Sequence, residues 1–224
     1  MIDQLIIGNK ASYDDFEASV AESRIKQPKK KKIKDTVPFS NTTYDFSAIN
    51  GELYWEEREL EYLLEITAQS AESLEEKKTA LSDWLMNVTQ EELHDPFVED
   101  YHFIATFDDI DFADEEGHDK TTATVIFTAY PYKIADYPTQ KTIELEGGAL
   151  VQEQMLNNSS HRIAPTIVTD QAITLTYNGK TYEISAGTTT SDELLFAKGI
   201  NAFTLNNANS APCVVLIKFF EEVL

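Results

Sequence analysis

Regular alternation of apolar and polar residues is the feature that most restricts the folds open to this chain. Residues 121–129 place Ala123, Val125 and Phe127 on one side of an extended strand and threonines on the other. Residues 60–66 and 101–107 also alternate. β-Branched and aromatic residues in this pattern are typical of strands with one buried face. The sequence therefore predicts a mainly β fold.

The second half of the chain carries the clearest turn. Asn178 and Gly179 tolerate positive φ and separate residues 173–176 from residues 181–184, which predicts a two-residue β-hairpin. An apolar run at residues 213–220 predicts a strand buried between two sheets. Short strands with frequent turns favour a β-sandwich.

One helix is predicted, at residues 74–88. Ser73 and Glu76 have the spacing of a capping box, in which the two side chains satisfy free backbone N–H groups at the helix start. The apolar residues fall on one stripe, which is formed by Leu74, Leu81, Trp84, Leu85 and Val88. Because strands precede and follow it in the chain, we expect this helix to cover a sheet.

Two prolines and a change in charge mark a domain boundary within residues 130–139. We expect an α+β domain at residues 1–134 and a β-sandwich domain at residues 135–224. The formal net charge of −21 is concentrated in the first domain, where residues 35–119 hold 24 acidic and 3 basic side chains. The favoured interpretation of this charge is solubility, and the alternative is a surface that repels DNA or steers a basic partner.

Neither secretion nor membrane insertion is indicated. Cys213 is the single cysteine, which excludes an intrachain disulfide, and its apolar neighbours predict an inert buried thiol. The first residues lack the basic segment and the long apolar run of a signal peptide. Nothing approaches the roughly 18 apolar residues of a membrane helix. We therefore expect cytoplasmic synthesis and no membrane partner.

The sequence predicts no enzyme activity. The histidines His94, His102, His118 and His161 lack the spacing of a helical metal site. The sequence also lacks a nucleophile elbow, a phosphate-binding loop and a dinucleotide-binding loop. We therefore expect no catalytic residue, no cofactor and no metal site.

Two acidic clusters have alternative readings. Residues 108–117 offer oxygen ligands for Ca²⁺ but lack the Gly and the spaced Glu of a calcium-binding hand, so a solvated loop between strands is favoured. Residues 56–61 hold four glutamates that offer a carboxylate pair for glycoside hydrolysis. Nothing in the sequence would raise the pKa of one of them selectively.

Residues 29–32 are four consecutive lysines beside this acidic region. A hairpin tip or a loop between strands is the favoured reading. A contact with the acidic region of a neighbouring subunit and binding of nucleic acid are the alternatives.

Several segments, in this order, resemble the distal tail proteins of siphophages that infect Gram-positive bacteria. They are Pro38, Tyr44-Asp45-Phe46-Ser47, Tyr54-Trp55-Glu56-Glu57-Arg58, the helix that follows, residues 102–112, residues 121–134, and residues 157–170 with the Asn-Gly hairpin. The resemblance covers nearly the whole chain and rests on the order and spacing of these segments.

The resemblance implies a structural protein of the virion, located at the tail tip or baseplate. Six copies of the first domain, a β-sandwich-like sheet with one helix, would form a ring that joins the tail tube protein to the tail-associated hub protein and the host-adsorption apparatus. Receptor-binding proteins are a further implied partner. DNA would pass through the ring without specific binding, and an acidic lumen would repel its phosphates.

The resemblance also implies that the second domain is a galectin-like β-sandwich. The alternative function is therefore a carbohydrate-binding tail module that contacts the host cell surface. His161 and Arg162 are residue types that galectins use for sugar, but the second domain has no tryptophan. An exposed aromatic platform would have to come from Tyr137, Tyr177, Tyr182 or Phe196.

The expected subunit interface is formed by Tyr44, Phe46, Tyr54, Trp55 and Arg58. Large aromatic residues and arginine are enriched at the centres of protein interfaces. Arg58 suits a carboxylate on the same or the next subunit, because its guanidinium donates hydrogen bonds in a fixed fork. The alternative for Phe46 and Trp55 is an ordinary place in the core.

Overall fold

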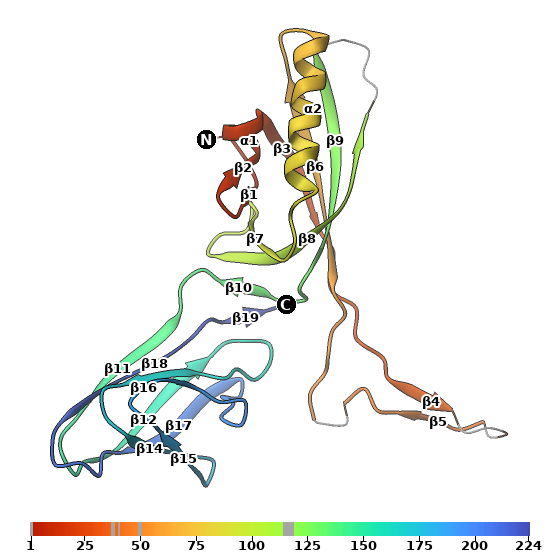
Figure 1. The fold of residues 1–224 in the computed structure, drawn as a ribbon. Coiled ribbons are helices and arrows are strands. Elements are labelled where there is room, and N and C mark those ends of the chain that lie inside the picture. Colours follow the sequence, from red (N-terminus) through yellow and green to blue (C-terminus); the bar gives the residue numbers. More distant parts are fainter. Residues whose placement is uncertain (1, 37–38, 40, 49–50, 114–118) are drawn as a thin grey trace. The chain divides into compact units, whose positions relative to one another are not determined.

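The computed structural model describes residues 2–36, 39, 41–48, 51–113 and 119–224. The chain divides into two compact units, unit 1 (Met1–Lys133 with Leu224) and unit 2 (Ile134–Val223) (Figure 1). Strands predominate in both, which confirms the mainly β fold class. Pro38 and residues 114–118, which carry part of the resemblance and of the acidic cluster, lie outside the described residues.

Unit 1 is built on an antiparallel sheet in which seven strands follow one continuous order. Across the sheet they are β2 (Lys10–Ala11), β1 (Ile6–Ile7), β7 (Glu91–His94), β8 (Tyr101–Phe112), β9 (Lys120–Ala129), β6 (Arg58–Thr67) and β3 (Ala18–Ile25). The expected alternation is confirmed in β9, where Ala123, Val125 and Phe127 are fully buried. Strand β3 and the short helix α1 (Ser12–Phe16) were not expected from the sequence.

Helix α2 (Ala71–Leu85) packs on this sheet, as predicted, and buries Leu74, Leu81, Trp84 and Leu85 in the same core (Figure 1). The predicted capping box is wrong. The helix begins three residues earlier, and the Ser70 side chain accepts a hydrogen bond from the Ser73 backbone N–H at 3.2 Å. Either serine has the chemistry of a cap, and starting at Ser70 adds a helical turn before Leu74 enters the core.

Unit 2 is a β-sandwich of two four-stranded sheets that share one apolar core. The first sheet has the order β11 (Thr139–Leu145), β18 (Cys213–Phe219), β13 (Thr166–Thr169), β16 (Gly187–Thr190). The second has the order β12 (Leu150–Asn157), β17 (Gly199–Asn206), β14 (Ile173–Tyr177), β15 (Lys180–Ile184). Strand β10 (Lys133–Ala135) also pairs with β19 (Glu222–Val223).

The Asn-Gly hairpin of unit 2 is confirmed. Asn178 and Gly179 have φ of 49° and 77° and connect β14 to β15. The expectation for residues 213–220 needs a correction, because β18 is buried on one face only and Val214 on its other face is 46% exposed. Cys213 lies on the inner face, where burial raises the pKa of its thiol.

Neither helix in the described part of the chain is long and apolar enough to cross a membrane.

Candidate contact surface on an extended arm

The described residues between β3 and β6 (26–36, 39, 41–48 and 51–57) leave the sheet of unit 1, and we call them the arm (Figure 1). The first part of the arm keeps the register of the β3–β6 pair, in which Ile25 faces Leu60. Lys30 is bridged to Trp55, and the backbone N–H of Lys31 donates to the Tyr54 carbonyl at 2.8 Å. The base of the arm is therefore a continuation of two core strands.

The outer part of the arm is a separate two-stranded sheet of β4 (Lys34–Thr36) and β5 (Thr43–Asp45). Ser47 anchors it, because its buried hydroxyl accepts a hydrogen bond from the Ile33 backbone N–H at 2.9 Å. The Ser47 backbone N–H in turn donates to the Asp45 carboxylate at 2.9 Å. Hydrogen bonding from the Ser47 side chain, and then from its backbone N–H, lowers the pKa of Asp45.

Three of the five expected interface residues are exposed aromatic residues on the arm. Tyr44, Phe46 and Tyr54 are 51%, 39% and 43% exposed. The rings of Tyr44 and Phe46 are stacked, with centroids 6.3 Å apart and planes at 16°. Exposed aromatic rings on a paired backbone have little conformational entropy to lose on binding, so this surface is suited to a protein contact.

Trp55 and Arg58 differ from these three residues. Trp55 is partly buried where the arm leaves the core. Arg58 is the first residue of β6 and is only 3% exposed. Its guanidinium donates to the Pro131 carbonyl and lies over the Phe103 ring, with 5.5 Å between Cζ and the ring centroid. Burial lowers the pKa of Arg58. The structure thus places Arg58 inside unit 1, away from the aromatic surface.

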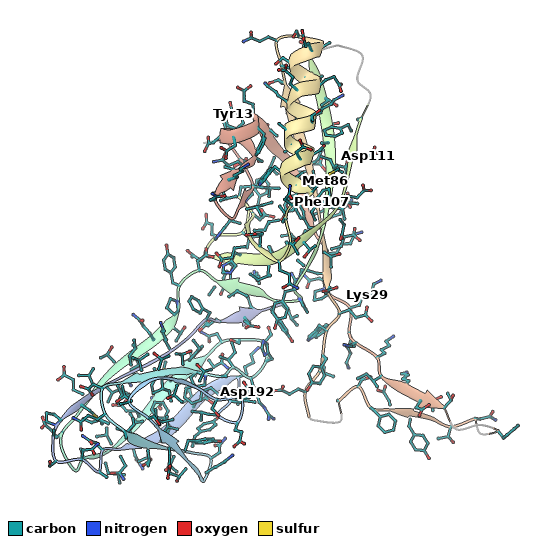
Figure 2. All side chains as sticks on the ribbon, in the orientation of Figure 1. Tyr13, Lys29, Met86, Phe107, Asp111 and Asp192 are labelled. Carbon is teal, nitrogen blue, oxygen red and sulfur yellow. The ribbon has the colours of Figure 1, made fainter. Side chains whose placement is uncertain are left out.

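The lysine run lies between β3 and β4, as expected for a segment between strands, but it is not a hairpin tip. Its backbone is paired with residues 54–56, since the Glu56 N–H also donates to the Lys29 carbonyl at 2.8 Å. All four lysines are exposed, and Figure 2 labels Lys29 where the arm leaves the sheet. The arm therefore combines basic and aromatic side chains in a unit that is otherwise strongly acidic.

Three further exposed apolar residues of the arm were missed by sequence reasoning. They are Ile33, Phe39 and Leu53. Ile33 and Leu53 flank the aromatic segments in the chain. In the sequence alone, an apolar residue at these positions is as consistent with a buried side chain as with an exposed one.

The loop expected at residues 108–117 is wrong for residues 108–112, which belong to strand β8. The carboxylates of the two acidic clusters make contacts along strands. Glu59 pairs with Lys26 across the β3–β6 pair, and Glu61 lies 3.6 Å from Arg24. On β8, the Asp108 carboxylate accepts a hydrogen bond from the Thr128 hydroxyl. Each of these three carboxylates therefore has a partner within the sheet of unit 1 or at its edge.

The residues that would carry sugar binding in unit 2 are mostly engaged in its fold. Tyr177 and Phe196 are buried in the core, and the Tyr182 hydroxyl donates to the Glu193 carbonyl at 3.0 Å. The His161 ring lies 2.8 Å from the Glu222 carboxylate. Of the four aromatic candidates, Tyr137 alone is widely exposed, at 76%.

No protein-family model and no curated protein matches this sequence. Among solved structures, a structure of the phage P2 baseplate in its activated conformation with Ca covers 97% of this chain and 98% of that chain, at 10% identity and a TM-score of only 0.38. The crystal structure of SPP1 Dit is described as a paradigm of the hub adsorption apparatus in phages that infect Gram-positive bacteria. It covers 100% of both chains at 12% identity, with a TM-score of 0.70. The chain therefore has the fold of the SPP1 Dit protein along its whole length.

Proposed function

We propose that this chain is a structural distal tail protein, which forms a ring between the tail tube and the host-adsorption apparatus of a phage. The observation that carries the proposal is the match to SPP1 Dit, which extends over the whole of both chains. A match confined to a β-sandwich would cover only unit 2. This match covers unit 1, with its arm, as well as the sandwich of unit 2. We propose no enzymatic activity.

In this proposal the ring contains six copies, and the arm supplies the contact between neighbouring copies. The exposed rings of Tyr44, Phe46 and Tyr54 would become buried, and each Å² of apolar surface removed from water contributes about 25 cal/mol. Backbone pairing supports this role, because Tyr54 lies in the base of the arm, which keeps the register of β3 and β6, and Tyr44 lies on β5, which pairs with β4.

Charge supports the same contact. The lysines at residues 29–32 are exposed, and unit 1 offers an acidic surface on α2 through Glu72, Glu75, Glu76 and Asp83. A basic arm from one copy would be attracted to the acidic helix of the next, which favours one direction around the ring and opposes pairing of like surfaces. We propose this helix face as the surface that receives the arm.

The acidity of unit 1 supports a channel for DNA. A lumen lined by carboxylates repels phosphate, so the genome would pass without being held. The exposed Asp109 and Asp111 on β8 are the kind of side chain such a lumen needs (Figure 2 labels Asp111). The proposed partners are the tail tube protein above the ring, the tail-associated hub protein below it and receptor-binding proteins around it.

Immunogold labelling of intact virions tests the proposed location. Antibodies raised against unit 2 should label the tail tip, on one end of each particle. Labelling of the capsid, or absence of the chain from purified virions by mass spectrometry, would contradict the proposal.

A further inference from the structure

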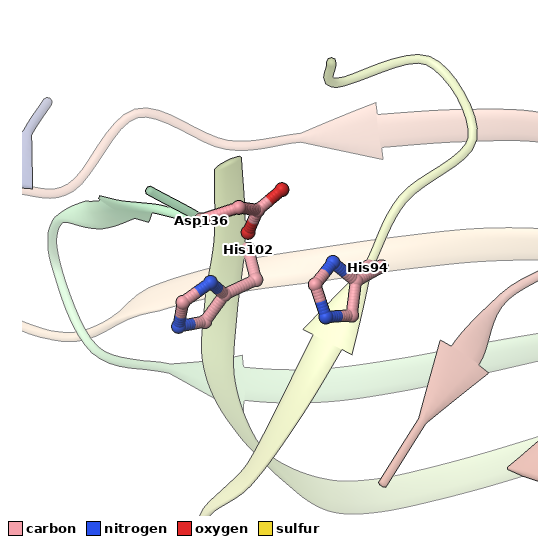
Figure 3. A group of neighbouring side chains, drawn as sticks. All are labelled: His94, His102 and Asp136. Atoms are coloured by element: carbon pink, nitrogen blue, oxygen red, sulfur yellow. The ribbon is translucent and has the colours of Figure 1, made fainter. Parts of the chain in front are cut away.

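His94 and His102 lie opposite one another on neighbouring strands of unit 1. In the antiparallel pair of β7 and β8, Leu93 faces Phe103, so the next residues in register are the two histidines. Their ring centroids are 5.4 Å apart, with the ring planes at 44° (Figure 3). Figure 3 also labels Asp136, which belongs to unit 2.

The backbone that carries the two histidines is held on both sides. Leu93 and Phe103, the preceding pair, are buried in the core of unit 1. After His94, the buried carboxylate of Asp95 accepts hydrogen bonds from the Ser23 hydroxyl at 2.6 Å and from the Phe97 backbone N–H at 2.7 Å. The two imidazoles therefore project from a fixed frame, which is the arrangement that a preorganised site requires.

The distance between the rings suits a shared metal ion. The ligand nitrogens of the two histidines lie within 4.8 Å of one another. Two nitrogens bound to one tetrahedral zinc ion, each at about 2.0–2.1 Å, are about 3.3 Å apart. This separation falls inside the 4.8 Å limit within which the ligand nitrogens lie.

We propose that His94 and His102 form a two-histidine site for a divalent transition-metal ion, with water in the remaining coordination positions. Imidazole nitrogen favours Zn²⁺, Cu²⁺ and Ni²⁺, whereas Ca²⁺ and Mg²⁺ favour oxygen ligands. The strong negative charge of unit 1 raises the local concentration of any divalent cation. The site lies within one unit and does not depend on the proposed tail function.

This pair was missed in the sequence because the two histidines are eight residues apart. That spacing matches no helical or strand motif for metal binding. The β7–β8 hairpin brings the pair together, and its register was not predicted. An antiparallel hairpin with a histidine at both ends of its loop is the signal that would have revealed it.

Titration of the full chain, purified without a histidine tag, tests the proposal. Isothermal titration calorimetry with Zn²⁺ should show one site per chain, and Zn²⁺ should raise the melting temperature because it binds the folded state. His94→Ala and His102→Ala should each weaken Zn²⁺ binding at least tenfold. The matched control His161→Ala, which removes a histidine of unit 2, should bind Zn²⁺ like the wild type.

The outcomes separate this site from nonspecific binding to carboxylates. A tenfold excess of Ca²⁺ should leave the Zn²⁺ affinity within a factor of two, and displacement by Ca²⁺ would overturn the proposal. Equal Zn²⁺ binding by the His94→Ala variant, or no binding by the wild type at millimolar Zn²⁺, would also overturn it. Because His102 is buried, circular dichroism must show that its variant is folded. If it is not, the result for the more exposed His94 decides.

Discussion

Lys30 and Trp55 form an antiparallel bridge in the same register as Ile25 and Leu60, which belong to the core strands β3 and β6. The arm is thus fixed to unit 1 by the backbone pairing that builds the sheet. This relationship means that changes to exposed arm side chains should affect contacts with other molecules and leave the fold of unit 1 intact.

The first prediction concerns the aromatic side chains of the arm. The double variant Tyr44→Ser, Phe46→Ser should weaken self-association at least tenfold, since it removes two stacked rings from the proposed contact. At a concentration where both proteins are monomeric, its melting temperature should differ from that of the wild type by less than about 2 °C, because both rings are exposed. Analytical ultracentrifugation measures the association. The matched control is Tyr137→Ser, which removes an exposed aromatic residue of unit 2 and should assemble normally.

The second prediction concerns charge. If the lysine run contacts an acidic helix, then Lys30→Glu, Lys31→Glu should abolish assembly at low salt, because the contact becomes repulsive. For the wild type, raising NaCl from 0.1 M to 1 M shortens the screening length from about 10 Å to about 3 Å, so assembly should weaken. The control Lys198→Glu changes an exposed lysine of unit 2. If neither 1 M NaCl nor the double substitution weakens assembly, the electrostatic part of the contact is excluded.

The third prediction separates Arg58 from the arm. Arg58→Ala should lower the free energy of unfolding by about 2–3 kcal/mol, because the variant loses a charge-assisted hydrogen bond and the packing on Phe103. Arg58→Met should lose less, since it keeps an apolar stem and removes a buried charge. Urea denaturation gives both values. Loss of assembly at unchanged stability would show instead that Arg58 is an interface residue.

The fourth prediction follows from Tyr62, whose side chain is fully buried beside Phe127. Burial, and then the charge of Asp95, raises the pKa of Tyr62 well above its ordinary value. Above pH 10 the unfolded tyrosine loses its proton while the folded one keeps it, so stability falls as pH rises. Tyr62→Phe should reduce this fall by up to about 1.4 kcal/mol per pH unit. Urea denaturation at pH 9, 10 and 11 compares the two proteins, and identical slopes would contradict the assignment.

The strands and the sandwich could be predicted from the sequence because alternation reports directly on which face is buried. Ala123, Val125 and Phe127 lie on one face of β9 and are buried as expected. The Asn178-Gly179 turn was equally predictable, since few residue pairs accept positive φ at both positions. The start of α2 was not, because Ser70 and Ser73 have the same capping chemistry and only the packing of the first turn selects between them.

The candidate contact surface was predictable in part. The aromatic segments around Tyr44 and Tyr54 were identified, but local pattern cannot show whether an aromatic residue has a covering layer. Arg58 shows the limit most clearly, because its neighbours in the chain are acidic while its contacts are Pro131 and Phe103, both distant in sequence. Sequence proximity favoured a carboxylate partner, and tertiary packing supplied a backbone carbonyl and an aromatic ring.

The mass of the purified full-length chain in its native state tests the central proposal most directly. Native mass spectrometry at low salt should give a complex of six chains, or of two stacked rings of six, and negative-stain electron microscopy should show a ring with an open centre. Deletion of the outer arm, residues 32–53, should return the protein to a folded monomer. A wild-type chain that stays monomeric at every concentration up to about 100 μM, well above the micromolar range of weak specific association, would contradict the account.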